Sequence, residues 1–171
     1  MSGLGLWIRK VTMTNVDLPE MTVRGDFVLS SLSDGLELSR CTGAVKAFSS
    51  DDVDKRIVSI GTGAFANVEA LRSVVLSGSV TRIDDYAYMG CEDLADVRLQ
   101  DGLASIGSNA FAGCKNLRGL YVPPTVTLIG ANAFPDDGDF TLYGAKDSAI
   151  HRYAVANGMT FISARGPAAA A

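Results

Sequence analysis

Hydrophobic residues recur along the chain at a fixed interval of 23 positions, and this period predicts how the chain folds. Writing the sequence in rows of 23 from residue 59 gives three complete rows and the start of a fourth. Four apolar places are filled in all four rows, and the first three are Ile60, Ile83, Ile106 and Ile129, then Ala64, Ala87, Ala110 and Ala133, then Phe65, Tyr88, Phe111 and Phe134. Further apolar places follow: Leu71, Leu94, Leu117 and Phe140, then Val74, Val97 and Leu120, then Leu76, Leu99 and Val122, then Val80, Leu103 and Val126. Such self-similarity indicates a stack of repeated units.

Each row predicts a short strand, a turn and a second extended piece. The strands are the stretches rich in β-formers, with apolar residues at the first, fourth and sixth places, namely 71–76, 94–99 and 117–122. Turn residues end them at Ser77-Gly78, Gln100-Asp101 and Pro123-Pro124. Residues 80–83 begin the next extended piece, and the spacing in 84–91 suits one helical or 3₁₀ turn. No row can bury its apolar residues alone, so the rows must stack with strands about 4.8 Å apart.

The repeat also decides how to interpret a glycine motif at residues 61–66. There a short apolar run leads into G-x-G-x-x-A, the outline of a dinucleotide-binding turn. A nucleotide turn is used once per site, whereas this motif recurs as IGSNAF and IGANAF in later rows. We therefore interpret Gly61, Gly107 and Gly130 as turn residues and expect positive φ there, a conformation that Asp84 would tolerate in the second row.

A stack of rows exposes an apolar surface at each end unless a cap covers it. Residues 27–58 supply apolar side chains for an N-terminal cap, namely Phe27, Leu29, Leu36, Leu38 and Val45. At the other end, residues 146–158 predict a helix that starts at Asp147 or Ser148 and ends at Asn157-Gly158, with a strand at 159–162. The predicted plan is an unassigned segment 1–25, a cap with a degenerate repeat 26–58, repeats 59–143, a cap helix and strand 144–163, and a disordered tail 164–171.

Length and charge narrow the classes of function. The 171 residues predict one domain, 47% are hydrophobic, and the net charge of −4 comes from scattered side chains. Without a basic run we expect no binding of nucleic acid, and without a long apolar segment we expect no membrane insertion. The first residues, MSGLGLWIRKVTMTN, lack the pattern of an export signal, which leaves the cytoplasm or a longer exported protein as alternatives.

The residues that could carry chemistry do not form a catalytic or metal-binding motif. His151 is the only histidine, and we interpret it as an exposed residue of the cap helix. Cys91 and Cys114 occupy the same place in successive rows, where they predict buried packing, with a disulfide open as an alternative; Cys41 is out of register. The acidic clusters at 51–54 and 136–139 predict solvated turns rather than a calcium site. We expect no cofactor and no enzymatic activity.

The rows resemble a known repeat. The pattern V-x-x-I-G-x-x-A-F-x-x-C-x-x-L-x-x-V-x-L-P-x-x-V, best matched by SIGSNAFAGCKNLRGLYVPPTVT, is similar to the BspA-like leucine-rich repeats of bacterial surface proteins. The first complete row departs from it at Val68, where the pattern has Cys. The resemblance implies a right-handed leucine-rich repeat solenoid of the β/α type, with about four repeats between end caps. It also implies a protein-binding or adhesion module at the cell surface or secreted, with a host or surface protein as partner. A structural spacer within a longer surface protein is the alternative, and we expect a monomer.

One column of side chains is the candidate binding surface. If the first, fourth and sixth residues of each strand point inward, the fifth points outward, which selects Val75, Arg98 and Tyr121. Arg and Tyr are enriched among the residues that dominate binding energy at protein interfaces. We therefore predict that these three residues lie at the centre of a protein-binding patch.

Overall fold

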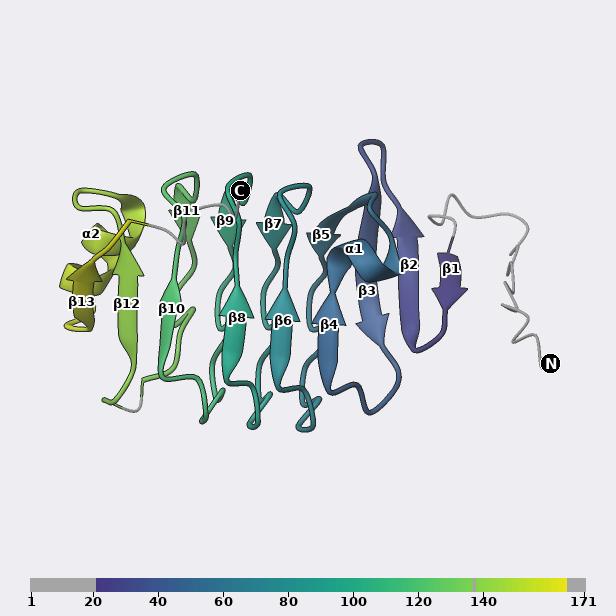
Figure 1. Ribbon diagram of the computed structural model, residues 1–171, viewed down its shortest axis with the longest axis horizontal. Helices are drawn as coiled ribbons and strands as arrows, with labels where there is room; N and C mark the ends of the chain where they lie inside the picture. Colours follow the sequence, from purple (N-terminus) through teal and green to yellow (C-terminus); the bar gives the residue numbers. More distant parts are fainter. Residues whose placement is uncertain (1–20, 137, 166–171) are drawn as a thin grey trace.

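The computed structural model describes residues 21–136 and 138–165, which form one elongated β-solenoid (Figure 1). Residues 1–20, 137 and 166–171 are not described, so Trp7, Asp137 and most of the predicted tail lie outside the described residues. The solenoid has a long sheet of seven strands and two shorter sheets of three strands. Successive rows lie side by side along its length, as the 23-residue period predicts (Figure 1).

The long sheet runs in the order β1-β2-β3-β5-β7-β9-β11. Its strands are β1 (Met21–Arg24), β2 (Phe27–Ser31), β3 (Leu36–Cys41), β5 (Ile57–Ile60), β7 (Arg82–Ile83), β9 (Ser105–Ile106) and β11 (Leu128–Ile129). The first three strands pair antiparallel and form the N-terminal cap, whereas β3 and the later strands pair in parallel. In the cap, Leu29 and Leu38 are fully buried, as predicted.

Two shorter sheets hold the strands predicted at residues 71–76 and their equivalents. One contains β4 (Ala47–Ser49), β6 (Ser73–Val75) and β8 (Asp96–Arg98), and the other β10 (Gly119–Tyr121), β12 (Thr141–Gly144) and β13 (Thr160–Ser163). All pairs within them are parallel. A short helix α1 (Ser50–Val53) follows β4, and the cap helix α2 (Ala149–Ala156) precedes β13. Ser148 caps α2 and Asn157 ends it, close to the predicted bounds.

The apolar columns form one continuous core. The first three residues of the isoleucine column and all four of the alanine column are buried, whereas Ile129 in the last row is partly exposed. The aromatic column is a stack of nearly parallel rings, with centroid distances of 5.1 Å between Phe65 and Tyr88 and 5.2 Å between Tyr88 and Phe111. Because each row buries its side chains against its neighbours, the core depends on stacking rather than on any single row.

The segments between the strands are turns. No helix forms at residues 84–91, where one helical or 3₁₀ turn is predicted, but hydrogen bonds of the 3₁₀ type occur there, such as Met89 N–H to Tyr86 O at 3.0 Å and Cys91 N–H to Tyr88 O at 3.2 Å. These segments are held by three-residue backbone turns and by hydrogen bonds to the next row, such as Tyr88 N–H to Ala110 O at 2.8 Å. Hydrogen bonds within each turn and hydrogen bonds to the next row together satisfy its backbone groups.

The prediction of positive φ at Gly61, Gly107 and Gly130 is wrong. Positive φ occurs two residues later in each row, at Gly63, Tyr86, Asn109 and Asn132. At Gly107 a β-carbon would lie 2.5 Å from backbone atoms of Asp84 and Asp85 in the row before, so glycine allows the rows to approach closely there.

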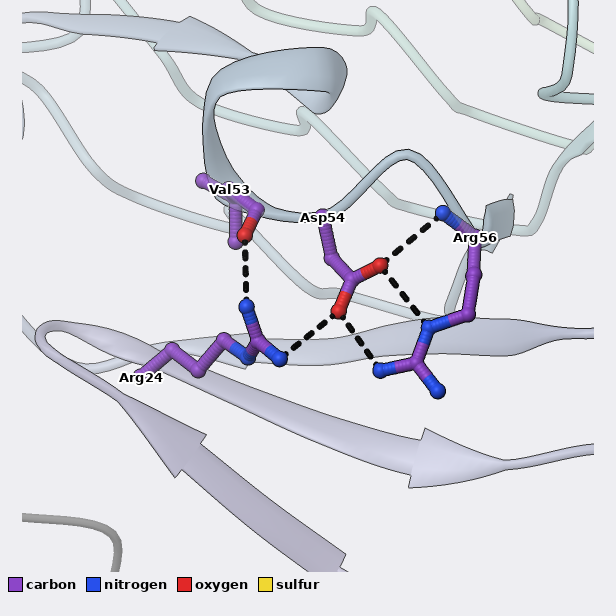
Figure 2. Close-up of polar contacts among 4 residues, drawn as sticks. All are labelled: Arg24, Val53, Asp54 and Arg56. Atoms are coloured by element: carbon purple, nitrogen blue, oxygen red, sulfur yellow. Dashed lines mark hydrogen bonds and ion pairs between the residues drawn. The ribbon is translucent and has the colours of Figure 1, made fainter.

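A buried carboxylate joins the N-terminal cap to the stack (Figure 2). Asp54, predicted to lie in a solvated turn, has a side chain only 7% exposed, and it pairs with Arg24 of β1 at 3.0 Å and with Arg56 at 2.9 Å. Arg24 also donates to the carbonyl of Val53 at 3.2 Å. The side-chain hydrogen bond from Arg56 is the main cause that lowers the pKa of Asp54. The segment left unassigned by the sequence therefore contributes a strand, β1, that is tied to α1.

Candidate functional site

The three residues predicted to face outward occupy equivalent places in their strands. Val75 and Arg98 are register partners in β6 and β8, and Tyr121 ends β10 in the same place. The inward neighbours Val74 and Leu120 are buried, whereas the side chain of Arg98 is 70% exposed. Val75 and Tyr121 are half-buried.

The strand register extends this set at both ends. Ser49 pairs with Val75, Tyr121 pairs with Tyr143, and Tyr143 pairs with Ile162 of β13. Ile162 is 48% exposed. We call the set the strand-face column, and its members are Ser49, Val75, Arg98, Tyr121, Tyr143 and Ile162.

The 23-residue period does not identify Tyr143. Val75 and Arg98 are 23 residues apart, but Tyr121 and its partner Tyr143 are only 22 apart, because the fourth row is one residue shorter. Adding 23 to Tyr121 leads to Gly144, which is buried. The alternation of apolar and polar residues in 140–144 is the signal that could have identified Tyr143.

A neighbouring column of small side chains supports the tyrosines. Gly119 of β10 pairs with Thr141 of β12, and Thr141 pairs with Thr160 of β13. A β-carbon at Gly119 would lie 2.8 Å from a ring carbon of Tyr143. The ring of Tyr143 therefore lies against Gly119, and any larger residue there would displace it.

The charged side chains beside the column form weak, exposed ion pairs. Nε of Arg98 lies 3.4 Å from a carboxylate oxygen of Asp96, and Nε of Arg72 lies 3.6 Å from one of Asp93. Exposed pairs of this kind contribute about 0–1 kcal/mol. A partner that presents a carboxylate could therefore recruit Arg98 at little cost.

The backbone ladder is interrupted at the middle of the strand-face column. Leu76 N–H donates to Arg98 O at 2.9 Å, and Val122 N–H donates to Tyr143 O at 2.9 Å. Within residues 21–136 and 138–165 the equivalent bond from Leu99 N–H to Tyr121 O is absent, and β8 and β10 belong to separate sheets. Figure 1 shows the two strands side by side nonetheless. Arg98 and Tyr121 thus flank a gap in the ladder.

The thiols at equivalent places in two rows are buried, as predicted. Cys91 and Cys114 are 0% exposed and free, and each donates to a backbone carbonyl of the row before, Phe65 O and Tyr88 O respectively. Burial raises the pKa of each thiol to about 12. At neutral pH they are protonated, so they act as packing groups rather than as nucleophiles.

The only histidine is partly buried, which corrects its interpretation as an exposed residue. The side chain of His151 is 28% exposed, its ring lies 4.6 Å from that of Phe161, and its Nδ1 accepts from Asp147 N–H at 3.1 Å. Its own backbone N–H donates to Ser148 Oγ, whose proton goes to Ala145 O. Ser148 is therefore not positioned as a nucleophile for this imidazole.

The described residues offer no cluster of side chains for a metal ion. They contain no group of three or more His, Cys, Asp or Glu side chains arranged to hold a metal ion. Neither described helix is long and apolar enough to cross a membrane.

Comparison with known proteins gives a repeat family and a set of similar folds. The sequence pattern of the BspA type leucine rich repeat region matches residues 44–141 in six copies, more than the four rows predicted. No curated protein matches the sequence. The fold is similar to a leucine rich cell surface protein from Faecalibacterium prausnitzii, with a TM-score of 0.70 and 20% identity, over 86% of this chain and 40% of that one.

Two other solved structures are similar. A leucine rich repeat protein of T. pallidum has a TM-score of 0.53 and 25% identity, over 77% of this chain and 71% of that one. A leucine-rich repeat protein from Bacteroides capillosus has a TM-score of 0.62 and 22% identity, over 72% of this chain and 97% of that one. The chain spans less than half of the F. prausnitzii protein but nearly all of the B. capillosus protein.

Proposed function

Because the chain belongs to the BspA type leucine-rich repeat family, we propose that it is a non-enzymatic module that binds a protein partner through its strand-face column. The observation that carries the proposal is the register of Tyr121, Tyr143 and Ile162 at one outward place in successive strands, with Arg98 at the equivalent place in β8. Arg and Tyr supply large contacts at protein interfaces, and Ile162 adds an exposed apolar group.

The location we propose is the cell surface or the exterior of the cell. The relative from F. prausnitzii is a cell surface protein, and we extend that location to this chain as part of the proposal. A role as spacer is the second candidate, because the chain matches only 40% of that longer relative.

The test is a comparison of two double variants that remove the same residue types. Arg98→Ala with Tyr121→Ala empties the centre of the column, whereas Arg40→Ala with Tyr86→Ala removes an exposed Arg and an exposed Tyr outside the column. Partners are first captured from host or surface protein extracts with the immobilised wild-type chain, and each affinity is then measured with the purified partner.

We expect the first double variant to weaken binding at least tenfold, which is a loss of about 1.4 kcal/mol, with nearly unchanged melting. The control should bind as the wild type does. Equal binding by both folded variants would exclude the strand-face column. If the chain binds no partner but joins folded domains in its full-length protein, the spacer role replaces the binding role.

A further inference from the structure

Backbone hydrogen bonds link the turn of each row to the turn of the next. In each turn the N–H of the positive-φ residue and the N–H of the aromatic residue both donate to carbonyls of the following row. The bonds are Gly63 to Asp85, Tyr86 to Ser108 and Asn109 to Ala131 for the first place, and Phe65 to Ala87, Tyr88 to Ala110 and Phe111 to Ala133 for the second. Each turn therefore binds the turn of the following row through two carbonyls that lie on either side of the positive-φ residue of that row.

This ladder ends at the fourth row. Asn132 and Phe134 hold the two donor places, and no acceptor for their N–H groups lies among the described residues. The N–H of Gly113 also has no acceptor among the described residues. Its equivalent in the row before, Gly90, donates to Ala112 O, but the chain leaves the row pattern after Phe134. A buried backbone donor normally finds a partner, so the N–H of the buried Phe134 is unusual in having no acceptor among the described residues, whereas Gly113 and Asn132 beside it are exposed.

These three residues line one pocket of about 220 Å³ between the last turn and the end of α2. Phe134 and Met159 form an apolar wall of the pocket. The ring of Tyr153 meets that of Phe134 edge-on, with the two ring centroids 5.4 Å apart. The hydroxyl of Tyr153 accepts from Ala133 N–H at 3.0 Å and keeps its own proton for a further acceptor. The pocket thus offers hydrogen-bond donors above an apolar surface.

The charges around the pocket favour a ligand with a positive group beside the carbonyls that accept from these N–H donors. The exposed carboxylate of Asp136 lies on its wall, and α2 ends at Asn157, where the helix dipole presents its negative end. Burial is the main cause that raises the pKa of Tyr153, and the charge of Asp136 adds to this. Asp136 is therefore close enough to act on groups within the pocket.

We propose that this pocket binds a short turn of another protein, with main-chain carbonyls on the N–H groups of Asn132 and Phe134 and a Lys or Arg side chain near Asp136. This turn takes the place of the next row, whose carbonyls bind these donors everywhere else in the stack. The volume is below the roughly 300–1,000 Å³ of pockets for drug-sized ligands, so only a short stretch enters. The site is separate from the strand-face column and independent of the function proposed for it.

The experiment titrates ¹⁵N-labelled full-length protein with the peptide acetyl-Ala-Ala-Lys-amide and follows the amide signals of Gly113, Asn132 and Phe134. We expect these signals to shift together, with a Kd on the order of 1 mM. The matched peptide acetyl-Ala-Ala-Gln-amide should bind at least threefold more weakly. Asp136→Asn should remove the difference between the peptides while the three signals still shift.

A filling variant and its control complete the test. Ala112→Met should abolish the shifts by occupying the pocket, and the fold should accept it because Met89 stands at the same place in the second row. Ala66→Met, at that place in the first row, should leave binding unchanged. The proposal fails if the three amides do not respond in the wild type, if Ala112→Met binds as well, or if free lysine alone produces the same shifts, since the main chain would then not be recognised.

Discussion

Replacing Tyr88 by Phe should stabilise the protein, although it removes a polar group from the middle of the core. The side chain is fully buried, and its hydroxyl has no hydrogen-bond partner among the described residues. The ring stacks on Phe65 at 5.1 Å and on Phe111 at 5.2 Å, so the same column already holds Phe on both sides. Tyr88→Phe keeps those contacts and removes only the hydroxyl.

The magnitude follows from what the hydroxyl loses on folding. A hydroxyl that is taken out of water without a new hydrogen bond costs about 1–3 kcal/mol by mutational data. The deletion leaves little empty volume, so Tyr88→Phe should raise the free energy of unfolding by about 1–2 kcal/mol. For a chain of this size, each kcal/mol corresponds to roughly 2–4 °C in Tm. The same burial raises the pKa of Tyr88 well above its ordinary value of 10.0.

Tyr153→Phe is the matched control, because its hydroxyl does have a partner. It accepts from Ala133 N–H at 3.0 Å, and its removal should cost about 0.5–1.5 kcal/mol. Urea unfolding of the wild type and the two variants, followed by circular dichroism, gives both differences. If Tyr88→Phe is destabilising by more than about 0.5 kcal/mol, the hydroxyl is satisfied in the native protein and the reasoning is refuted.

Three further outcomes follow from the same contacts. Cys91 and Cys114, whose pKa values are raised to about 12, should react with a thiol reagent only after unfolding, and rapid labelling of the native protein would contradict their burial. Asp54 has a lowered pKa, so its stabilising effect is complete above its ordinary value of 3.8 and is lost as the pH falls through the lower folded value; Asp54→Asn should therefore destabilise at pH 7 and progressively less as the pH falls below 3.8, and an effect that does not shrink would oppose this. The amide of Leu99 should exchange hydrogen faster than that of Leu76, whose carbonyl partner lies in the next row, and equal protection would show that the ladder is continuous there.

The sequence predicts the core well because each apolar place is sampled several times. An isolated Ile60 says little, but its recurrence at Ile83 and Ile106 marks one buried column, and all three are buried. The same repetition does not predict the backbone conformation of the turns. Gly61 is the glycine that stands out in the sequence, yet positive φ falls on Gly63 and Tyr86. A turn conformation depends on which N–H faces the next row, and residue type alone does not specify that direction.

The candidate site is predictable only where the rows keep their length. Val75 and Arg98 follow from the period, and β6 and β8 pair them in register. Tyr143 and Ile162 do not, since the fourth row lacks one residue and β13 belongs to the cap. The sequence does not predict the ion pair of Asp54 either, because its partner Arg24 comes from a strand with no counterpart in the repeats.

The features that the sequence does not predict have a common physical origin. Inside a regular stack each row meets a copy of itself, so most backbone donors and apolar side chains are satisfied by the next row and little is left to bind anything else. Groups that can bind a partner remain where the repeat is interrupted. The ladder gap between Arg98 and Tyr121 interrupts the strand face, and the shortened fourth row places Tyr143 against Gly119. The last turn leaves the donors at Asn132 and Phe134 without acceptors among residues 21–136 and 138–165. The departures from the period, rather than the period itself, are therefore where partner recognition in this chain should be sought.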